Sequence, residues 1–93
     1  MKTVEVMQQA LDHFGEINQT DKAIEELGEL IVALSRYRQA EGAEKTQRAI
    51  EVITELADAK IMIKQMILLF GAWEVEQQIK FKIDRLIDRM GHG

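Results

Sequence analysis

Two short acidic segments, each with carboxylates three residues apart, could do chemistry in this sequence. Glu26 and Glu29 form the first pair, and Glu55 and Asp58 form the second. Residues three apart on an α-helix differ by about 60° around the axis and ~4.5 Å along it, so both members of a pair point the same way. Each pair could chelate one cation, and ligand sets made only of carboxylates favour hard ions such as Mg²⁺ or Mn²⁺.

The spacing of the two pairs predicts that they meet. Gly42 lies midway between them in a short polar segment, and helices joined by a short loop are antiparallel neighbours. Residues equally far from Gly42 then lie at the same height, which pairs Glu26 with Asp58 and Glu29 with Glu55. We therefore expect four carboxylates at one level, holding Mg²⁺, with Mn²⁺ as a substitute.

The alternative for these acids is an ordinary solvated helix face. Such a face usually carries Lys or Arg three or four positions from each acid, because these pairs stabilise a helix. Only Glu26 has a cation in reach, Lys22, whereas Glu29, Glu55 and Asp58 have none. Like charges ~4 Å apart repel by ~4 kcal/mol at an effective dielectric constant of ~20, so a half-buried cluster needs a cation. The missing partners favour the metal site.

The size and composition of the chain describe one small domain over residues 1–93. The chain has 46% apolar residues, a formal net charge of −4, no Pro and no Cys. The lack of Cys excludes disulfides and thiolate metal sites. A domain of this size buries only about 60–65% of the surface that its unfolded chain exposes. We therefore expect a homodimer or homotetramer, which would bury more.

The sequence predicts a cytoplasmic protein without membrane or nucleic-acid contacts. Residues 1–10 show neither the apolar core nor the cleavage site of a signal peptide. The longest apolar run, residues 61–70, contains Lys64 and Gln65 and is far shorter than the ~20 residues of a membrane span. The negative net charge and the lack of a basic stripe argue against nucleic-acid binding.

Apolar residues recur at helical spacing throughout, which predicts an all-α chain arranged as an antiparallel four-helix bundle and completed by oligomerisation. The expected helices cover residues 3–14, 20–40, 46–70 and 73–90. Thr20 and Thr46 are expected as N-caps of the second and third helices. Gly15 and Gly71 are expected to end the first and third helices, with residues 16–19 as a linker.

Each expected helix has one apolar stripe that we predict to be buried. In chain order the stripes are Val4, Met7, Leu11 and Phe14; Ile24, Leu27, Ile31 and Leu34; Ile50, Ile53, Ala57, Ile61 and Leu68; and Val75, Ile79, Ile83, Leu86 and Met90. In a four-helix bundle these stripes would pack against one another around a shared core.

The two acidic segments resemble the hallmark of the MazG-like, all-α nucleoside triphosphate pyrophosphohydrolases, an ExxE motif followed after a short spacer by ExxD. The matching strings are Glu25-Glu26-Leu27-Gly28-Glu29-Leu30 and Thr54-Glu55-Leu56-Ala57-Asp58-Ala59. Residue type, order, spacing and helical context agree over roughly half of the chain. The resemblance implies that residues 1–93 form a single MazG-like domain.

The resemblance also implies a Mg²⁺-dependent hydrolase that cleaves the α–β phosphoanhydride of a nucleoside or deoxynucleoside triphosphate. The products would be a nucleoside monophosphate and pyrophosphate, as in house-cleaning of non-standard nucleotides. Glu26, Glu29, Glu55 and Asp58 would be the catalytic residues, acting through the metal and not as nucleophiles. Such hydrolysis needs charge neutralised on phosphoryl oxygens and a positioned water, which a carboxylate-held Mg²⁺ cluster supplies.

The polyphosphate of such a substrate also needs donor groups. Arg36 lies seven residues after Glu29, and helical side chains lean toward the N-terminus of their helix, which aims Arg36 back at the acids. The same lean aims Arg48 away from the acids and Gln65 toward them. We predict Arg36 and Gln65 as substrate-binding residues, against the alternative that Arg36 is ordinary surface charge near a loop.

Other features separate this chain from its superfamily or leave its function open. Phosphoribosyl-ATP pyrophosphatases carry Tyr-His after the second motif, where this chain has residues 59–62, Ala-Lys-Ile-Met, which argues against histidine biosynthesis. No ligand follows the second motif, so water or Glu51 would complete the coordination. His13 and His92 belong to no ligand group. The alternative function is a non-catalytic helical module that binds a partner, in which the acids serve only solubility.

Overall fold

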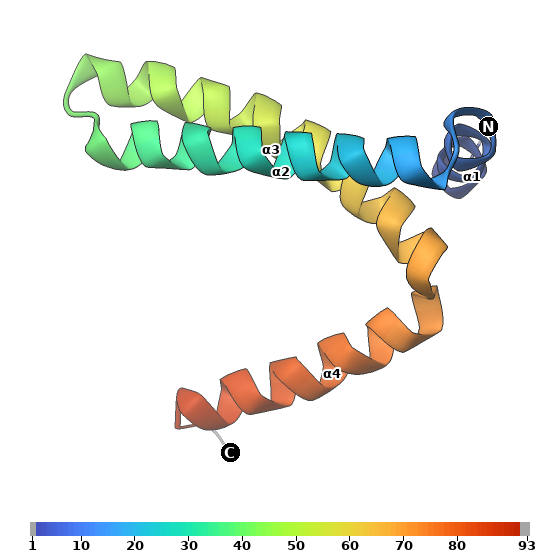
Figure 1. The fold of residues 1–93 in the computed structure, drawn as a ribbon. Helices are drawn as coiled ribbons and strands as arrows, with labels where there is room; N and C mark the ends of the chain where they lie inside the picture. The colour runs from blue at the N-terminus through green and yellow to red at the C-terminus, as the bar shows by residue number, and fades with distance from the viewer. Residues whose placement is uncertain (1, 92–93) are drawn as a thin grey trace.

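Four α-helices make up almost all of the computed structural model, which describes residues 2–91 (Figure 1). They are α1 (Thr3–Phe14), α2 (Glu16–Gln39), α3 (Ala43–Phe70) and α4 (Ala72–Arg89). The described range contains no strand, which confirms the all-α class. Within residues 2–91, none of these helices combines the length and the apolar character that a membrane crossing requires.

The centre of the molecule is an antiparallel hairpin of α2 and α3 (Figure 1). A tight turn joins them, in which the Ala40 amide donates to the carbonyls of Arg36 and Tyr37 at 3.1 and 3.2 Å. Gly42 completes the reversal at φ 61°, a value that L side chains rarely adopt. The side chains buried along the hairpin are small or polar and include Ala23, Glu26, Ala33, Ala59, Met62 and Gln65.

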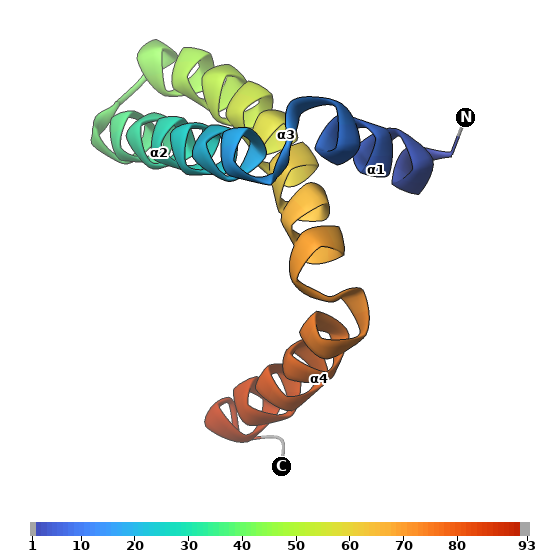
Figure 2. The same ribbon diagram turned by 45° about the vertical axis from the view of Figure 1, so that its right-hand side comes forward.

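The two outer helices are attached to this hairpin in different ways. Helix α1 packs against both α2 and α3 and buries Met7 and Leu11. Helix α4 contacts only α3 among the helices, stands away from the hairpin (Figure 2) and has no buried residue. The radius of gyration is 16.5 Å, whereas a compact domain of this length has about 12 Å. One chain therefore contains four helices but does not by itself enclose the core of a four-helix bundle.

The predicted start of the second helix is wrong. Helix α2 begins at Glu16, so residues 16–19 are helical and are not a linker. Gly15 makes the whole connection at φ 89°, and its amide donates to the Leu11 carbonyl at 2.9 Å. Thr20 lies inside the helix, where its hydroxyl donates to the Glu16 carbonyl at 2.8 Å. A glycine turn has replaced the expected side-chain cap.

The predicted start of the third helix is also wrong, for the same reason. Helix α3 begins at Ala43, three residues before Thr46, and Gly42 precedes it without a side-chain cap. The predicted helix ends at Phe14 and Phe70 are confirmed, because Gly15 and Gly71 follow them. Glycine positions were thus the better guide to helix bounds than threonine caps.

The apolar stripes predicted to be buried on α2 and α3 are mostly exposed in the single chain. Ile24 and Ile31 are 66% and 67% exposed, and Leu27, Leu34, Ile50, Ile53, Ala57 and Ile61 are also exposed. Helix α2 turns another side toward α3, the one that carries its buried alanines and Glu26. A periodic pattern identifies an apolar face, but it does not specify what covers that face.

We predict that Gly71→Ala destabilises the fold, because the turn between α3 and α4 holds residue 71 at φ 130°. The strain should cost about 1–3 kcal/mol in the free energy of unfolding, measured by urea denaturation at fixed protein concentration. Gly28→Ala is the matched control, since Gly28 is helical and a Cβ there would meet nothing within 4 Å. The control should gain about 0.5–1 kcal/mol. Equal midpoints for wild type and Gly71→Ala would contradict the strain.

Candidate metal centre

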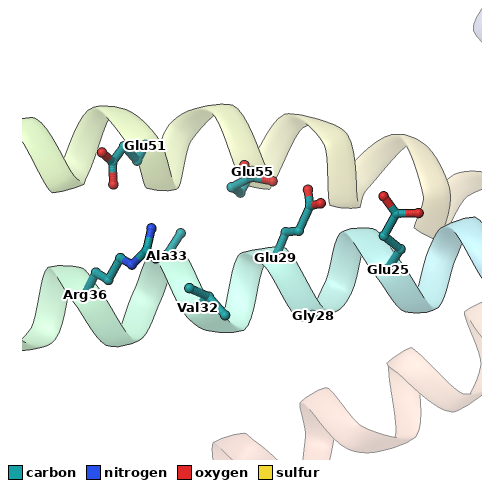
Figure 3. A pocket seen from close by; sticks show the side chains of 8 residues that line it. All are labelled: Glu25, Gly28, Glu29, Val32, Ala33, Arg36, Glu51 and Glu55. Atoms are coloured by element: carbon teal, nitrogen blue, oxygen red, sulfur yellow. The ribbon is translucent and has the colours of Figure 1, made fainter.

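Three of the four predicted carboxylates converge between α2 and α3. Glu26, Glu29 and Glu55 each offer an oxygen, and these oxygens all lie within 4.8 Å of one another. Figure 3 shows Glu29 reaching from α2 toward α3, with Glu55 on the facing helix. The tight turn between the helices brings Glu29 and Glu55 together, as the mirror spacing about Gly42 predicted, whereas Asp58, the predicted partner of Glu26, is not in the group. We call Glu26, Glu29 and Glu55 the acidic cluster.

Glu26 is the innermost member of the acidic cluster. Its side chain points into the hairpin, and the residue is only 8% exposed. One oxygen, Oε1, forms an ion pair with Lys22 Nζ at 3.1 Å. The other, Oε2, is buried and has no hydrogen-bond partner among the described residues. A buried carboxylate oxygen without a donor is costly, so this oxygen is suited to bind a cation or to accept a hydrogen bond.

Glu29 and Glu55 complete the cluster from opposite helices. The Glu26 carboxylate raises the pKa of Glu29 above its ordinary value, and desolvation and the charge of Glu55 raise it further. Glu55 is half-buried, and its Oε2 also lacks a hydrogen-bond partner among the described residues. Both observations describe negative charge that the protein brings together without neutralising it.

The acidic cluster opens onto a surface pocket of about 390 Å³ between α2 and α3. Its lining residues, labelled in Figure 3, are Glu25, Gly28, Glu29, Val32, Ala33, Arg36, Glu51 and Glu55. Helical spacing explains the α2 side, because steps of three and four residues from Glu25 to Arg36 keep to one face. The pocket therefore combines glutamates from both helices, a small apolar floor and one arginine, with Glu51 on α3 opposite Arg36 (Figure 3).

The arginine placed in this pocket is the one that the sequence favoured. Arg36 extends from α2 into the pocket and forms no ion pair with any described residue. Arg48 instead pairs with Glu44 and Glu51 at 3.3 and 3.1 Å. Glu51 lines the pocket but is engaged by that pair, so it is less free to serve as a ligand than the acids of the cluster.

Two predicted site residues lie elsewhere. Asp58 is exposed and is not part of the acidic cluster. Its position one turn along α3 from Glu55 is not enough, because its side chain is one methylene shorter than those of the glutamates and does not reach the cluster. Gln65 is only 4% exposed, and it does not line the pocket. His13 is exposed and outside the cluster, and His92 lies beyond the described residues.

The sequence analysis gave no role to Glu25 or to the short apolar floor of Val32 and Ala33. These residues lie on the same face of α2 as Glu29 and Arg36, since steps of three or four residues connect positions 25, 29, 32, 33 and 36. Following that face from the acidic motif in both directions would have predicted that they line the pocket. Periodicity alone favoured a different, larger apolar stripe on the same helix.

The donor set fits a hard divalent cation. All three groups are carboxylates, and neighbouring ligands of a Mg²⁺ octahedron are about 3.0 Å apart and opposite ones about 4.2 Å. A group of oxygens within 4.8 Å of one another reaches that geometry through small side-chain rotations. The buried Oε2 atoms of Glu26 and Glu55 are the first candidates for ligands, because they lack donors among the described residues.

No family model, curated protein or solved structure matches the chain. The resemblance to the MazG-like pyrophosphohydrolases therefore depends on the two acidic motifs alone.

We predict that divalent-cation affinity rises with pH in the range above the ordinary carboxyl pKa of 4.5, because the pKa of Glu29 is raised. A cation must displace the proton that Glu29 retains in that range, so binding weakens as pH falls. Isothermal titration with Mg²⁺ or Mn²⁺ from about pH 8 down to about pH 5 measures the effect.

The same raised pKa has a consequence for stability without metal. Since the folded chain binds this proton more tightly than the unfolded chain, the metal-free protein loses stability as pH rises through the pKa of Glu29. Glu29→Gln should remove that loss and make metal-free protein more resistant to heat at neutral pH. An unchanged pH profile of stability in Glu29→Gln would contradict the assignment.

Proposed function

We propose that this protein is a MazG-like, Mg²⁺-dependent nucleoside triphosphate pyrophosphohydrolase. The observation that carries the proposal is the acidic cluster, whose buried oxygens lack partners among the described residues, at one end of a pocket that also contains an arginine without an ion pair in that range. Both motifs of the resemblance contribute to that cluster, Glu26 and Glu29 from the first and Glu55 from the second.

The charge of the pocket supports a metal-dependent reaction on a polyphosphate. Four glutamates and one arginine line it, so a free triphosphate would be repelled. A divalent cation bound at the acidic cluster would reverse this, neutralise charge on the phosphoryl oxygens and make water a better nucleophile. Hydrolysis then joins the water oxygen to the α-phosphorus and breaks the bond to the β-phosphate, which leaves as pyrophosphate.

The residues of the chain have distinct parts in this proposal. Glu26 and Glu55, from facing helices, would hold the cation. Glu29 lies nearer to solvent and holds a proton more readily than an ordinary carboxylate, so it suits both metal binding and orientation of the attacking water. Arg36 would contact the phosphates at the far end of the pocket, as a fixed charge.

Asp58 and Gln65 remain proposed site residues with lesser support. Asp58 is an exposed acid one turn beyond Glu55 on α3, and a bound cation could draw its side chain in. Gln65 has a buried Oε1 without a hydrogen-bond partner among the described residues. We also propose that the active form is a homodimer or homotetramer, because one chain leaves most of its large apolar side chains exposed.

The proposal predicts release of pyrophosphate from nucleoside triphosphates, dependent on Mg²⁺ and lost in Glu29→Gln. A panel of ribonucleotides and deoxyribonucleotides should be assayed for pyrophosphate and for inorganic phosphate, with and without Mg²⁺. We expect monophosphate and pyrophosphate as products and a rate at least about 100-fold lower in Glu29→Gln. Mn²⁺ should substitute for Mg²⁺.

Glu41→Gln is the matched control, because Glu41 is an exposed acid in the turn between α2 and α3 and lies outside the pocket. It should keep the wild-type rate. Turnover that survives in Glu29→Gln would remove the acidic cluster from the reaction. No release from any nucleotide by folded protein would favour the partner-binding module, and release of inorganic phosphate would exclude α–β cleavage.

A second prediction concerns Arg36. If its guanidinium binds the phosphates, Arg36→Ala should raise KM about tenfold or more while metal affinity changes little. Arg38→Ala is the control, since Arg38 is an exposed arginine on the same helix that does not line this pocket. Equal KM values for the two variants would show that Arg36 is ordinary surface charge.

A further inference from the structure

We infer that two apolar stripes left uncovered by the single chain pack against each other between two copies of it, α4 of each copy lying on α2 of the other. The inference does not depend on catalysis, because it concerns a surface on the side of α2 away from the acidic cluster. It identifies which residues make the association and by which arrangement.

The first surface, the α2 stripe, consists of Ile17, Ile24, Leu27, Ile31 and Leu34. All five are exposed, Ile17 the most at 77%. The isoleucines recur every seven residues and the leucines follow each of the last two by three, which is the spacing that a helix presents to a partner helix. Such a stripe on a helix that is already paired on another side indicates a second helical partner.

The second surface, the α4 stripe, consists of Val75, Ile79, Ile83, Leu86 and Met90. These residues are three or four apart, so they form one narrow line along the helix and its last turn. Val75 is half-buried, and the others are exposed. No residue of α4 is buried in the chain, and its remaining sides carry mainly charged and amide side chains together with exposed Trp73, Phe81 and Ile87. The helix is amphipathic without a partner for its apolar side.

The α4 stripe cannot be covered by the hairpin of its own chain. Only Gly71 separates α3 from α4, whereas helices that fold back on each other need a connection of about 2–5 residues. In both views α4 turns sharply from the end of α3 and lies apart from α2 (Figures 1 and 2), and among the helices it contacts only α3. A partner for its apolar side must therefore come from another molecule.

The exposed area has the size that a stable dimer requires. The chain exposes 7191 Å², whereas a compact domain of 10.7 kDa exposes about 5,500 Å². The excess of about 1,700 Å² per chain corresponds to about 3,400 Å² for a pair, within the range of obligate homodimers. Burial of this area between two chains would provide the hydrophobic core that a single chain does not enclose.

A second copy is the occupant that satisfies both stripes at once. From Ile17 to Leu34 the α2 stripe runs about 26 Å, and from Val75 to Met90 the α4 stripe runs about 22 Å, so each fits the other. One two-fold axis repeats the contact, which leaves neither stripe exposed. If the α2 stripe instead packed on another α2 stripe, and the α4 stripe on another α4 stripe, two different interfaces would be needed to cover both.

Sedimentation velocity tests the inference on the full chain. Wild type should sediment as a dimer of the 10.7 kDa chain at micromolar concentration. Ile31→Glu and Ile83→Glu should each raise the dissociation constant at least about 100-fold, since a charge would be buried in an apolar contact. Gln78→Glu, an exposed position of α4 outside the stripe, is the control and should stay dimeric.

Mixing the two variants distinguishes the arrangement. In a dimer of one variant, each of the two α4-on-α2 contacts includes one substituted stripe. In a mixed dimer, one contact joins the two substituted stripes, and the other joins two unsubstituted stripes and is intact. An equimolar mixture should therefore recover dimers, with helicity by circular dichroism equal to wild type throughout. A monomeric wild type, a single variant that stays dimeric, or a mixture that stays monomeric would each overturn the inference.

Discussion

The close approach of α2 and α3 is the constraint on which the rest of the structure depends. Ala59 is the most buried residue of the hairpin at 1% exposure, and Ala23 and Ala33 are also buried along it. Small side chains at a helix contact let the axes approach to the short end of the usual 8–10 Å. That approach brings Glu26, Glu29 and Glu55 to one point, and it also means that the hairpin buries little apolar area of its own.

The acidic cluster lowers the stability of the metal-free hairpin, because its carboxylates are only partly compensated. Lys22 compensates one oxygen of Glu26, while oxygens of Glu26 and Glu55 lack donors among the described residues. The hairpin buries little apolar area and holds carboxylates that repel one another. It would therefore be unstable unless other contacts offset both effects. A departure from the usual rule that buried polar atoms are paired is the kind of local conflict found at functional sites. A cation would resolve the conflict directly.

The sequence predicted the helices and the meeting of the acids better than it predicted burial. The helical class, the glycine-terminated ends and the pairing of Glu29 with Glu55 needed only local rules and a short turn. The starts at Thr20 and Thr46 were wrong because glycines at positive φ, Gly15 and Gly42, precede these helices, which begin without a side-chain cap. Ile24 and Ile31 were predicted to be buried but are exposed, since a periodic stripe identifies an apolar face without specifying what covers it.

The opposite positions of the acidic cluster and the α2 stripe connect these observations. Glu29 and Ile31 are two residues apart, which places them about 160° apart around α2. The helix can thus present acids to a pocket on one side while its apolar side remains available for a second chain. Burial of that side would supply the free energy that the alanine-lined hairpin does not, without placing any large side chain near the carboxylates. In the dimer that we infer, this separation would let one helix carry both a polar site and a stabilising interface.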